Sequence, residues 1–481
     1  MQVQKYVAIA AAALIAGCNG SFGQIPGSAS AARSARYANG SSPIQHIVIV
    51  LQENRSFDNM FHGFPGANTV DSGAGHGKRY QLQEIPLKWT VYDLNHSHTQ
   101  FLEDYDQGKD DGFDSEITPK FKQGPGCSDP INHPACWVIY KTPKFQQMAY
   151  SYVKQSDVQP YWTMAQQYAL GDNAFPSNNG PTYVSHQYLI AGESGHASEV
   201  PNGQPWGCGA QQTGPNKVTV ELLEYGQADP PVFSKATGHE VDGPFPCFTY
   251  TTIADSLDAA GISWRYYVEG AGSGANLSAF MAIKKIYHGP DWKNVKSPDT
   301  AILKDIANNN LAQVSWVMPS GHKSDHPGPQ SGNLGPSWVA SIVNAVGQSP
   351  YWSNTAIVVM WDDWGGWYDH VHPPQYPDPQ TKAREGLGFR VPLIVVSPYA
   401  KPDYISHQQH EIASTLRFIE ETFALPFLGA GSGNTYADRR ADGFDDMFDF
   451  TQKPIQFKPI PSKQKASYFL THRDDTPADR Y

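Results

Sequence analysis

Three continuous apolar runs limit the folds that are open to this chain of 481 residues. The runs are His46–Leu51, Ala356–Met360 and Leu393–Val396, and each is rich in Ile and Val without alternating polar residues. Runs of this kind are typical of parallel strands that helices cover on both faces of a sheet. Residues 337–348 and 407–425 have apolar side chains at helical spacing. The sequence therefore predicts an α/β fold with a central, mostly parallel sheet between helices.

Polar side chains follow two of these runs, at the point where each expected strand ends. Glu53 and Asn54 follow the first run, and Asp362 and Asp363 follow the second. In open α/β sheets the ligand site lies beyond the carboxyl ends of the strands. Carboxylates gathered there repel one another unless a cation or a proton intervenes, and hard oxygen ligands suit Mg²⁺, Mn²⁺ or Ca²⁺. The alternative is that the two aspartates only cap helices or face solvent.

The segment QENRSFDNMF at residues 52–61 resembles the signature that opens the bacterial phosphoesterase family of phospholipases C and acid phosphatases. Other segments resemble further motifs of this family in the same order: Asp93–Ser97, Gly180–Thr182 with Tyr188–Leu189, Val314–Trp316 with Ser324–Pro327, WDDWGGWYDHVHPP at 361–374 and VPLIVVSPYAKPDYISH at 391–407. The resemblance covers roughly residues 44 to 425. It implies an alkaline-phosphatase-like α/β sandwich.

The resemblance also implies a role for seven residues. Those that would hold one divalent metal ion are Glu53, Asn54, Asp362 and Asp363. Thr182 would be the nucleophile and would form a phospho-threonine intermediate that water then releases. His96 and His326 would hydrogen-bond the phosphoryl oxygens or protonate the leaving oxygen, and Asn54 would also contact a phosphate oxygen.

This chain departs from the family pattern at several positions. The Asn-Arg or Asn-His pair that usually follows the nucleophile is Ser185-His186 here, so Ser185 is a second candidate nucleophile. The usual Asp-Glu pair is Asp362-Asp363, which keeps both carboxylates. Four aromatic residues could line an acyl-chain or choline pocket, or could simply pack around a Gly-rich turn. They are Trp361, Trp364, Trp367 and Tyr368.

The ends of the chain and one internal segment differ in composition from the rest. Residues 1–17 resemble a short export signal, and residues 18–43 are predicted to be a flexible tether. Residues 44–430 would form one catalytic domain with a loop-rich insertion near 195–250. Residues 431–481 would be a C-terminal extension that packs on the same domain.

The cysteines agree with export. Ile15–Cys18 resembles a bacterial lipobox, which would leave a lipid on Cys18, and ordinary cleavage after Ala29–Ala31 is the alternative. Four cysteines remain, and an even number suggests two disulfides in an oxidising compartment. Of the three pairings, we favour Cys127–Cys136 and Cys208–Cys247.

The leading interpretation is an exported, metal-dependent phosphoesterase of phospholipase C or acid phosphatase type, located in the periplasm, on the membrane as a lipoprotein, or outside the cell. Its substrate would be a phosphate ester, including phospholipids, and it would meet a membrane only through a lipid anchor or its substrate. With a net charge of −11 and no basic cluster, no nucleic-acid partner is expected. The alternatives are a sulfatase or phosphonate hydrolase of the same superfamily, and a non-enzymatic surface lipoprotein that keeps the fold as a binding module.

Overall fold

A computed structural model describes most of the chain. The described residues are 42–89, 93–116, 147–195, 197–201, 206–210, 219–222, 239–242, 245–270, 277–328, 331–377, 384–428 and 436–476. The predicted signal peptide, nearly all of the predicted tether and the predicted disulfide Cys127–Cys136 lie outside these residues.

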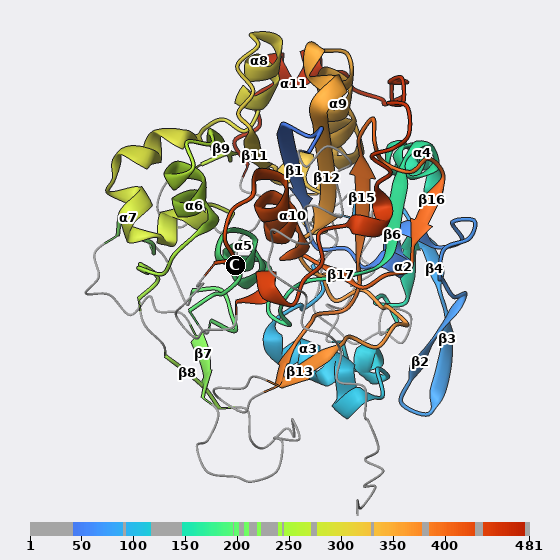
Figure 1. Cartoon of the computed structure of the whole chain (residues 1–481). Coiled ribbons are helices and arrows are strands. Elements are labelled where there is room, and N and C mark those ends of the chain that lie inside the picture. Colours follow the sequence, from blue (N-terminus) through green and yellow to red (C-terminus); the bar gives the residue numbers. More distant parts are fainter. Residues whose placement is uncertain are drawn as a thin grey trace, which may run out of the picture.

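A nine-stranded sheet crosses the middle of the molecule (Figure 1). Its order is β10 (Val295–Lys296), β9 (Trp264–Tyr267), β11 (Val314–Val317), β1 (His46–Gln52), β12 (Thr355–Trp361), β15 (Val391–Val396), β6 (Ala169–Phe175) and β16 (Tyr404–Ser406), and β17 (His410–Glu411) also pairs with β6. Every neighbouring pair is parallel except the two pairs that β15 makes. The predicted α/β fold with a mostly parallel sheet is confirmed.

The direction of one predicted strand was wrong. We expected Leu393–Val396 to be a parallel strand, but β15 runs antiparallel to both β12 and β6. All six residues of β15 are buried. A continuous apolar run reports burial on both faces of the sheet, and a strand inside a covered sheet is buried in either direction.

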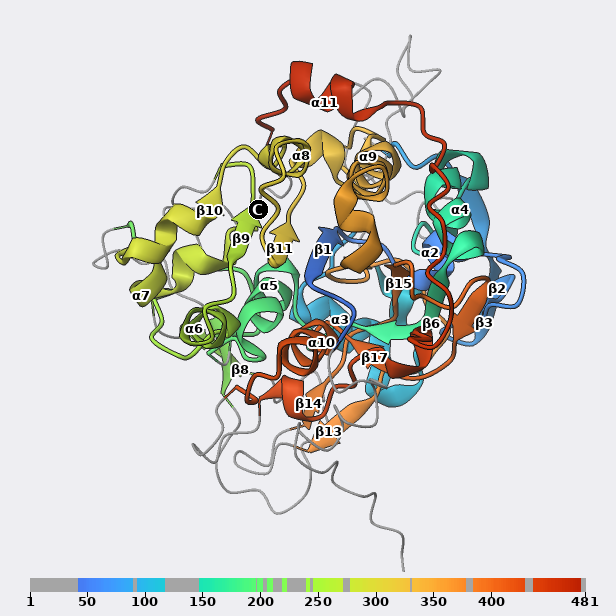
Figure 2. The same ribbon diagram turned by 45° about the horizontal axis from the view of Figure 1, so that its top comes forward.

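Helices cover both faces of the sheet (Figure 2). One layer contains α4 (Gln159–Gln167), α8 (Ala301–Ala307), α9 (Gly335–Gly347) and α11 (Ala466–Thr471), and the other contains α5 (Thr182–Ala191), α6 (Ile253–Ala259) and α10 (Ser414–Phe423). The two predicted helices correspond to α9 and α10. The start of the segment 407–425 forms β17 and a turn, so the second helix is shorter than expected.

Short elements surround these layers. Within the described ranges they include the helices α2 (Phe57–Phe61), α3 (His98–Tyr105) and α7 (Lys284–Tyr287). They also include two-stranded sheets made of β2 (Ser72–Gly75) with β3 (Lys78–Gln81), β4 (Gln83–Ile85) with β5 (Ser151–Val153), β7 (Thr219–Leu222) with β8 (His239–Asp242), and β13 (Gln375–Pro377) with β14 (Arg384–Gly386). The predicted disulfide Cys208–Cys247 is present, with its Cα atoms 4.8 Å apart.

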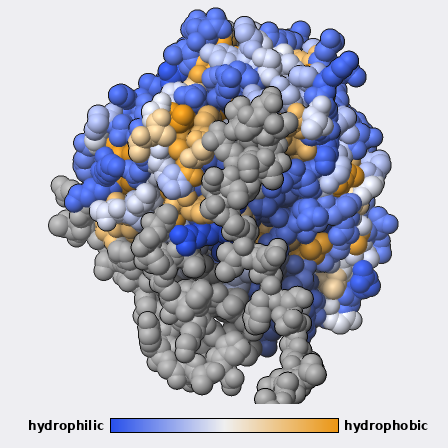
Figure 3. Space-filling view, viewed as in Figure 1, coloured by the Kyte–Doolittle hydropathy of each residue, from blue (hydrophilic) through white to orange (hydrophobic). Residues whose placement is uncertain are grey.

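One large apolar core joins the sheet to its helices, and apolar residues of the C-terminal segment belong to it, among them Phe444, Met447 and Phe469. The face in Figure 3 is mostly hydrophilic, with apolar residues in separate patches. Among the described residues, Leu470 is the one large apolar side chain that is exposed, at 43%. None of the helices in the described ranges combines the length and apolar character needed to cross a bilayer.

A buried arginine holds the loop that follows β1. Arg55 donates hydrogen bonds to the backbone oxygens of Asp325 (2.8 Å) and Leu87 (3.1 Å) and to Oδ1 of Asn59 (3.2 Å). Its guanidinium group lies 4.8 Å from the centre of the Trp367 ring. Burial lowers the pKa of Arg55 to about 10, and the charge of Asp325 partly opposes this. The arginine thus connects the first strand to three other segments.

We expect Arg55→Met to reduce the free energy of unfolding by about 3 kcal/mol, because it leaves several buried acceptors without a donor. Urea unfolding of the two proteins measures the difference. Arg79→Met is the control, since Arg79 is exposed on β3 and should change stability by less than about 0.5 kcal/mol. Equal effects of the two substitutions would contradict this role for Arg55.

Candidate active site

The ends of β1 and β12 bring the predicted metal ligands to one edge of the sheet. The two strands are parallel neighbours and pair in register as far as Gln52 and Trp361. The next residues of each chain segment therefore leave the sheet side by side. The four predicted ligands, Glu53, Asn54, Asp362 and Asp363, are all fully buried there.

Backbone hydrogen bonds fix the two aspartates. Asp362 Oδ1 accepts from the N–H groups of Asn54 (3.1 Å) and Asp363 (2.9 Å), and Asp363 Oδ1 accepts from the N–H of Gly365 (2.8 Å). Gly365 has a φ of +63°, and a Cβ on it would lie 2.2 Å from the backbone oxygen of Asn54. Each aspartate thus uses Oδ1 to hold the loops, and the Oδ2 atoms are the ones that meet side chains from elsewhere.

Thr182 lies against this aspartate pair. It is the first residue of α5, directly after Pro181, and its hydroxyl donates to Asp363 Oδ2 at 3.3 Å. Ser185, one turn further along, donates to the backbone oxygen of Asp362 (2.8 Å) and accepts from Asn178 Nδ2 (3.1 Å). The hydroxyl of Ser185 is therefore engaged in holding two loops, whereas that of Thr182 meets a carboxylate.

The two predicted histidines lie next to each other, with ring centres 6.0 Å apart. His96 reaches the metal-ligand group directly, since its Nε2 accepts from Asn54 Nδ2 at 2.9 Å. Asp93 Oδ2 lies 3.8 Å from Nδ1 of His96 and 3.7 Å from Nε2 of His326. Burial, and then the charge of His96, lowers the pKa of His326 to about 3.

The residues at the strand ends fit a divalent cation in their chemistry. Burial, and then the negative charge of Asp363, raises the pKa of Asp362 well above its usual range. Asn54 Oδ1 and Asp362 Oδ2 are buried, and no hydrogen bond from the described residues reaches either atom. A buried amide oxygen needs a hydrogen-bond donor or a cation, and a buried carboxylate oxygen needs a proton or a cation.

The structure does not gather all three predicted carboxylate ligands closely. Glu53, Asp362 and Asp363 do not form a group whose oxygens all lie within 4.8 Å of one another, whereas Asp93, His96 and His326 do form such a group. The hydrogen bond between Asn54 and His96 connects the predicted metal ligands to the group of Asp93, His96 and His326.

Two residues near the site were not assigned a role from the sequence. His186 lies four residues after Thr182 on α5, and its Nε2 is 3.7 Å from Asp362 Oδ2. Burial lowers the pKa of His186 to about 3. The spacing of four residues from Thr182 would place His186 on the same side of a helix, so the sequence contained a signal for its position near the site. Asp93 had a weaker signal, since only its position three residues before His96 connects it to the site.

The four aromatic residues near the aspartate pair are all buried. Trp361 Nε1 donates to Asp325 Oδ2 at 3.2 Å, and Trp364 Nε1 donates to Asp104 Oδ2 at 3.2 Å. Of the two interpretations of this cluster, the structure supports packing around the Gly-rich turn.

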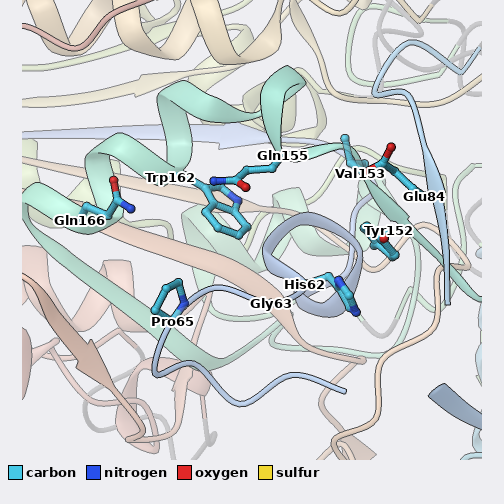
Figure 4. A pocket seen from close by; sticks show the side chains of 9 residues that line it. All are labelled: His62, Gly63, Pro65, Glu84, Tyr152, Val153, Gln155, Trp162 and Gln166. Carbon is cyan, nitrogen blue, oxygen red and sulfur yellow. The ribbon is translucent and has the colours of Figure 1, made fainter. Parts of the chain in front are cut away.

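A pocket of about 410 Å³ opens elsewhere, beside the end of α2, β5 and α4 (Figure 4). It is lined by His62, Gly63, Pro65, Glu84, Tyr152, Val153, Gln155, Trp162 and Gln166. None of these is a predicted site residue. The pocket is therefore not lined by the residues that are predicted to bind the metal ion or to take part in catalysis.

Comparisons with known proteins show which family the chain is similar to. The Phosphoesterase family matches residues 44–426. The non-hemolytic phospholipase C of Pseudomonas aeruginosa is 27% identical over 424 residues, which cover 79% of this chain and 54% of that protein. Phospholipase C A of Mycobacterium tuberculosis is 22% identical over 454 residues, which cover 86% of this chain and 79% of that protein.

Among solved structures, a protein in the alkaline phosphatase superfamily from Vibrio parahaemolyticus matches with a TM-score of 0.34 and 11% identity, over 81% of this chain and 68% of that one. The chain spans about half the length of the Pseudomonas phospholipases C that it matches. Because the family match runs from the start of β1 through α10 and includes every predicted site residue, this chain belongs to the Phosphoesterase family.

Proposed function

We propose that this protein is an exported, metal-dependent phosphoesterase that hydrolyses phosphate esters with Thr182 as its nucleophile. One observation carries the proposal: the Thr182 hydroxyl donates to Asp363 Oδ2 at 3.3 Å, at the strand ends where a second aspartate is also buried. A hydroxyl against a buried carboxylate pair is what a phosphoryl-transfer nucleophile requires, because the hydroxyl must lose its proton as it attacks. The family match supports the same chemistry.

Glu53, Asn54, Asp362 and Asp363 would hold a divalent metal ion, with Mg²⁺, Mn²⁺ and Ca²⁺ as the candidates. Such an ion, when bound, lowers the pKa of the nucleophile and neutralises charge on the phosphoryl group. The buried oxygens of Asn54 and Asp362 support a cation there.

The side chains then have separate tasks. The Thr182 oxygen attacks phosphorus, its proton passes to the carboxylate that already accepts its hydrogen bond, and the bond from phosphorus to the leaving oxygen breaks. Thr182 is the first residue of α5, and the N-terminus of a helix favours an anionic group such as the phosphoryl group. His96 and His326 would bind phosphoryl oxygens or protonate the leaving oxygen, and the carboxylate of Asp93 would stabilise that proton. Water then hydrolyses the phospho-threonine.

The relatives favour a phospholipid as substrate, since two of them are named phospholipases C. We propose a phosphodiester of this kind ahead of a simple phosphomonoester. Export is supported by the disulfide Cys208–Cys247, which forms in oxidising compartments. Contact with a membrane would come through the substrate or through a lipid on Cys18.

The test is hydrolysis of para-nitrophenyl phosphate and para-nitrophenyl phosphorylcholine by the purified full chain, with EDTA and then with Mg²⁺, Mn²⁺, Ca²⁺ or Zn²⁺ added. We expect turnover that EDTA abolishes and a divalent ion restores, with the phosphorylcholine ester preferred. Preference for the simple phosphate would indicate an acid phosphatase. Absence of turnover of both compounds with every ion would overturn the proposed function.

A further inference from the structure

His186 lies deep in the protein with one ring nitrogen facing the predicted metal ligands. It is fully buried on α5, one turn after Thr182. Its Nε2 lies 3.7 Å from Asp362 Oδ2. Within the described parts of the chain, neither of these two atoms has a hydrogen-bond partner of acceptable geometry.

The hydrogen bonds on the other side of the ring determine what Nε2 presents. His186 Nδ1 lies 3.4 Å from the hydroxyl of Tyr266, and this hydroxyl donates its own hydrogen to the backbone oxygen of Leu277 at 2.5 Å. The Tyr266 oxygen can therefore only accept from His186, so Nδ1 carries the proton. Nε2 is then left with a lone pair that faces an oxygen of Asp362.

Two lone pairs that face each other in a buried site repel, and burial removes the water that would separate them. A cation between them turns this repulsion into attraction. The distance of 3.7 Å between these two atoms is close to the separation of two ligands on one ion, because ligands about 2.0–2.1 Å from a tetrahedral Zn²⁺ ion lie about 3.3 Å from each other. Histidines that bind metals typically donate their other N–H to a neighbouring acceptor, as His186 does.

We propose that His186 Nε2 is a nitrogen ligand of the ion held by Asp362, and that it makes the site prefer Zn²⁺ over Mg²⁺ and Ca²⁺. The inference rests on the metal site of the proposed function and names the class of ion that this site takes. Imidazole is a good ligand for Zn²⁺ and other transition metals and a poor one for the hard cations Mg²⁺ and Ca²⁺. His186 is the second residue of the pair that follows Thr182, a position where the family pattern has Arg or His.

The test measures metal binding directly and does not depend on activity. The full chain is stripped with a chelator, and its affinities for Zn²⁺ and Mg²⁺ are measured by competition with chromophoric chelators. Loss of even an outer partner of a metal ligand typically costs 10–100-fold in affinity. We therefore expect His186→Gln to weaken Zn²⁺ binding about 100-fold or more and Mg²⁺ binding less than about threefold, since glutamine offers an oxygen. His407→Gln is the control with the same substitution, because His407 is exposed and its Nδ1 lies 2.9 Å from Asp172, which is not a predicted metal ligand.

A second measurement keeps the proposal falsifiable if His186→Gln does not fold. Pulsed electron paramagnetic resonance of the Mn²⁺-loaded wild-type protein should show nitrogen coupling from a directly bound imidazole, and His186→Gln should lose it. Persistence of that coupling in a folded variant, or equal loss of Zn²⁺ affinity in both variants, would overturn the assignment of His186. If Mn²⁺ binds and no nitrogen coupling appears, the assignment of His186 is overturned but the proposed metal dependence is not. This result is expected if a proton, and not an ion, lies between His186 and Asp362. Failure of every ion to bind would overturn the proposed metal dependence as well.

Discussion

Thr182→Ala should lower the turnover of para-nitrophenyl phosphorylcholine about 10⁴-fold or more, which is the effect expected when a covalent nucleophile is removed. The expectation follows from where the hydroxyl lies, at the first residue of α5 and 3.3 Å from Asp363 Oδ2. Thr182→Ser keeps a hydroxyl on the same backbone position and should keep measurable activity. Initial rates of the three proteins, compared at equal metal concentration, measure the effect.

Ser185→Ala is the matched control, since it removes a hydroxyl from the same helix face one turn away. It should lower turnover less than about tenfold, and the loss of its hydrogen bonds to Asp362 and Asn178 should cost about 1 kcal/mol of stability. If Ser185→Ala abolishes turnover and Thr182→Ala does not, Ser185 is the nucleophile and the mechanism must be rebuilt around it. Thermal unfolding of both variants separates loss of chemistry from loss of fold.

The parts of the site that are determined by strands could be predicted from the sequence. Two apolar runs ending in Glu53-Asn54 and Asp362-Asp363 were expected to meet because parallel strands end at one edge of a sheet, and β1 and β12 do pair in register there. Strand direction could not be predicted in the same way. The run in β15 is as apolar as those in β1 and β12, which are parallel to each other, but β15 runs antiparallel to β12. Composition reports burial, whereas direction depends on the connections between the strands.

The parts of the site that depend on a helix or a loop were harder to predict. The side of α5 that carries Thr182 also carries His186, but the sequence alone does not tell which side faces Asp362. Asp93 lies between two histidines because a loop before α3 meets one after β11, which is a matter of tertiary packing. The aromatic residues at the end of β12 could be interpreted either as core packing or as the lining of a ligand pocket, because large aromatic side chains are typical of both.

The second large effect concerns Asp363, where stability and activity should change in opposite directions. Without metal, Asp363→Asn should raise the free energy of unfolding at pH 7 by about 1–2 kcal/mol, because it removes one of two buried neighbouring carboxylates. The pKa of Asp362 is raised by burial and then by the charge of Asp363, as expected for two groups that repel. Asparagine still has an oxygen that can accept from the N–H of Gly365, so the loop should keep its shape. Turnover should fall about 10³-fold or more, since both a metal ligand and the acceptor for the Thr182 proton are lost.

Adding metal should reverse the order of stability. An ion that binds only the folded protein stabilises it, so the wild type should gain about 3 kcal/mol at a hundredfold excess over its dissociation constant, and the variant should gain little. Urea unfolding of both proteins, with EDTA and with excess ion, measures all four values. Asp403→Asn, at an exposed position, is the control and should change neither stability nor turnover. A variant that is less stable than the wild type without metal would show that the aspartate pair stabilises the fold by itself. A cation would then not be needed to explain why two acidic side chains are buried at the ends of the strands.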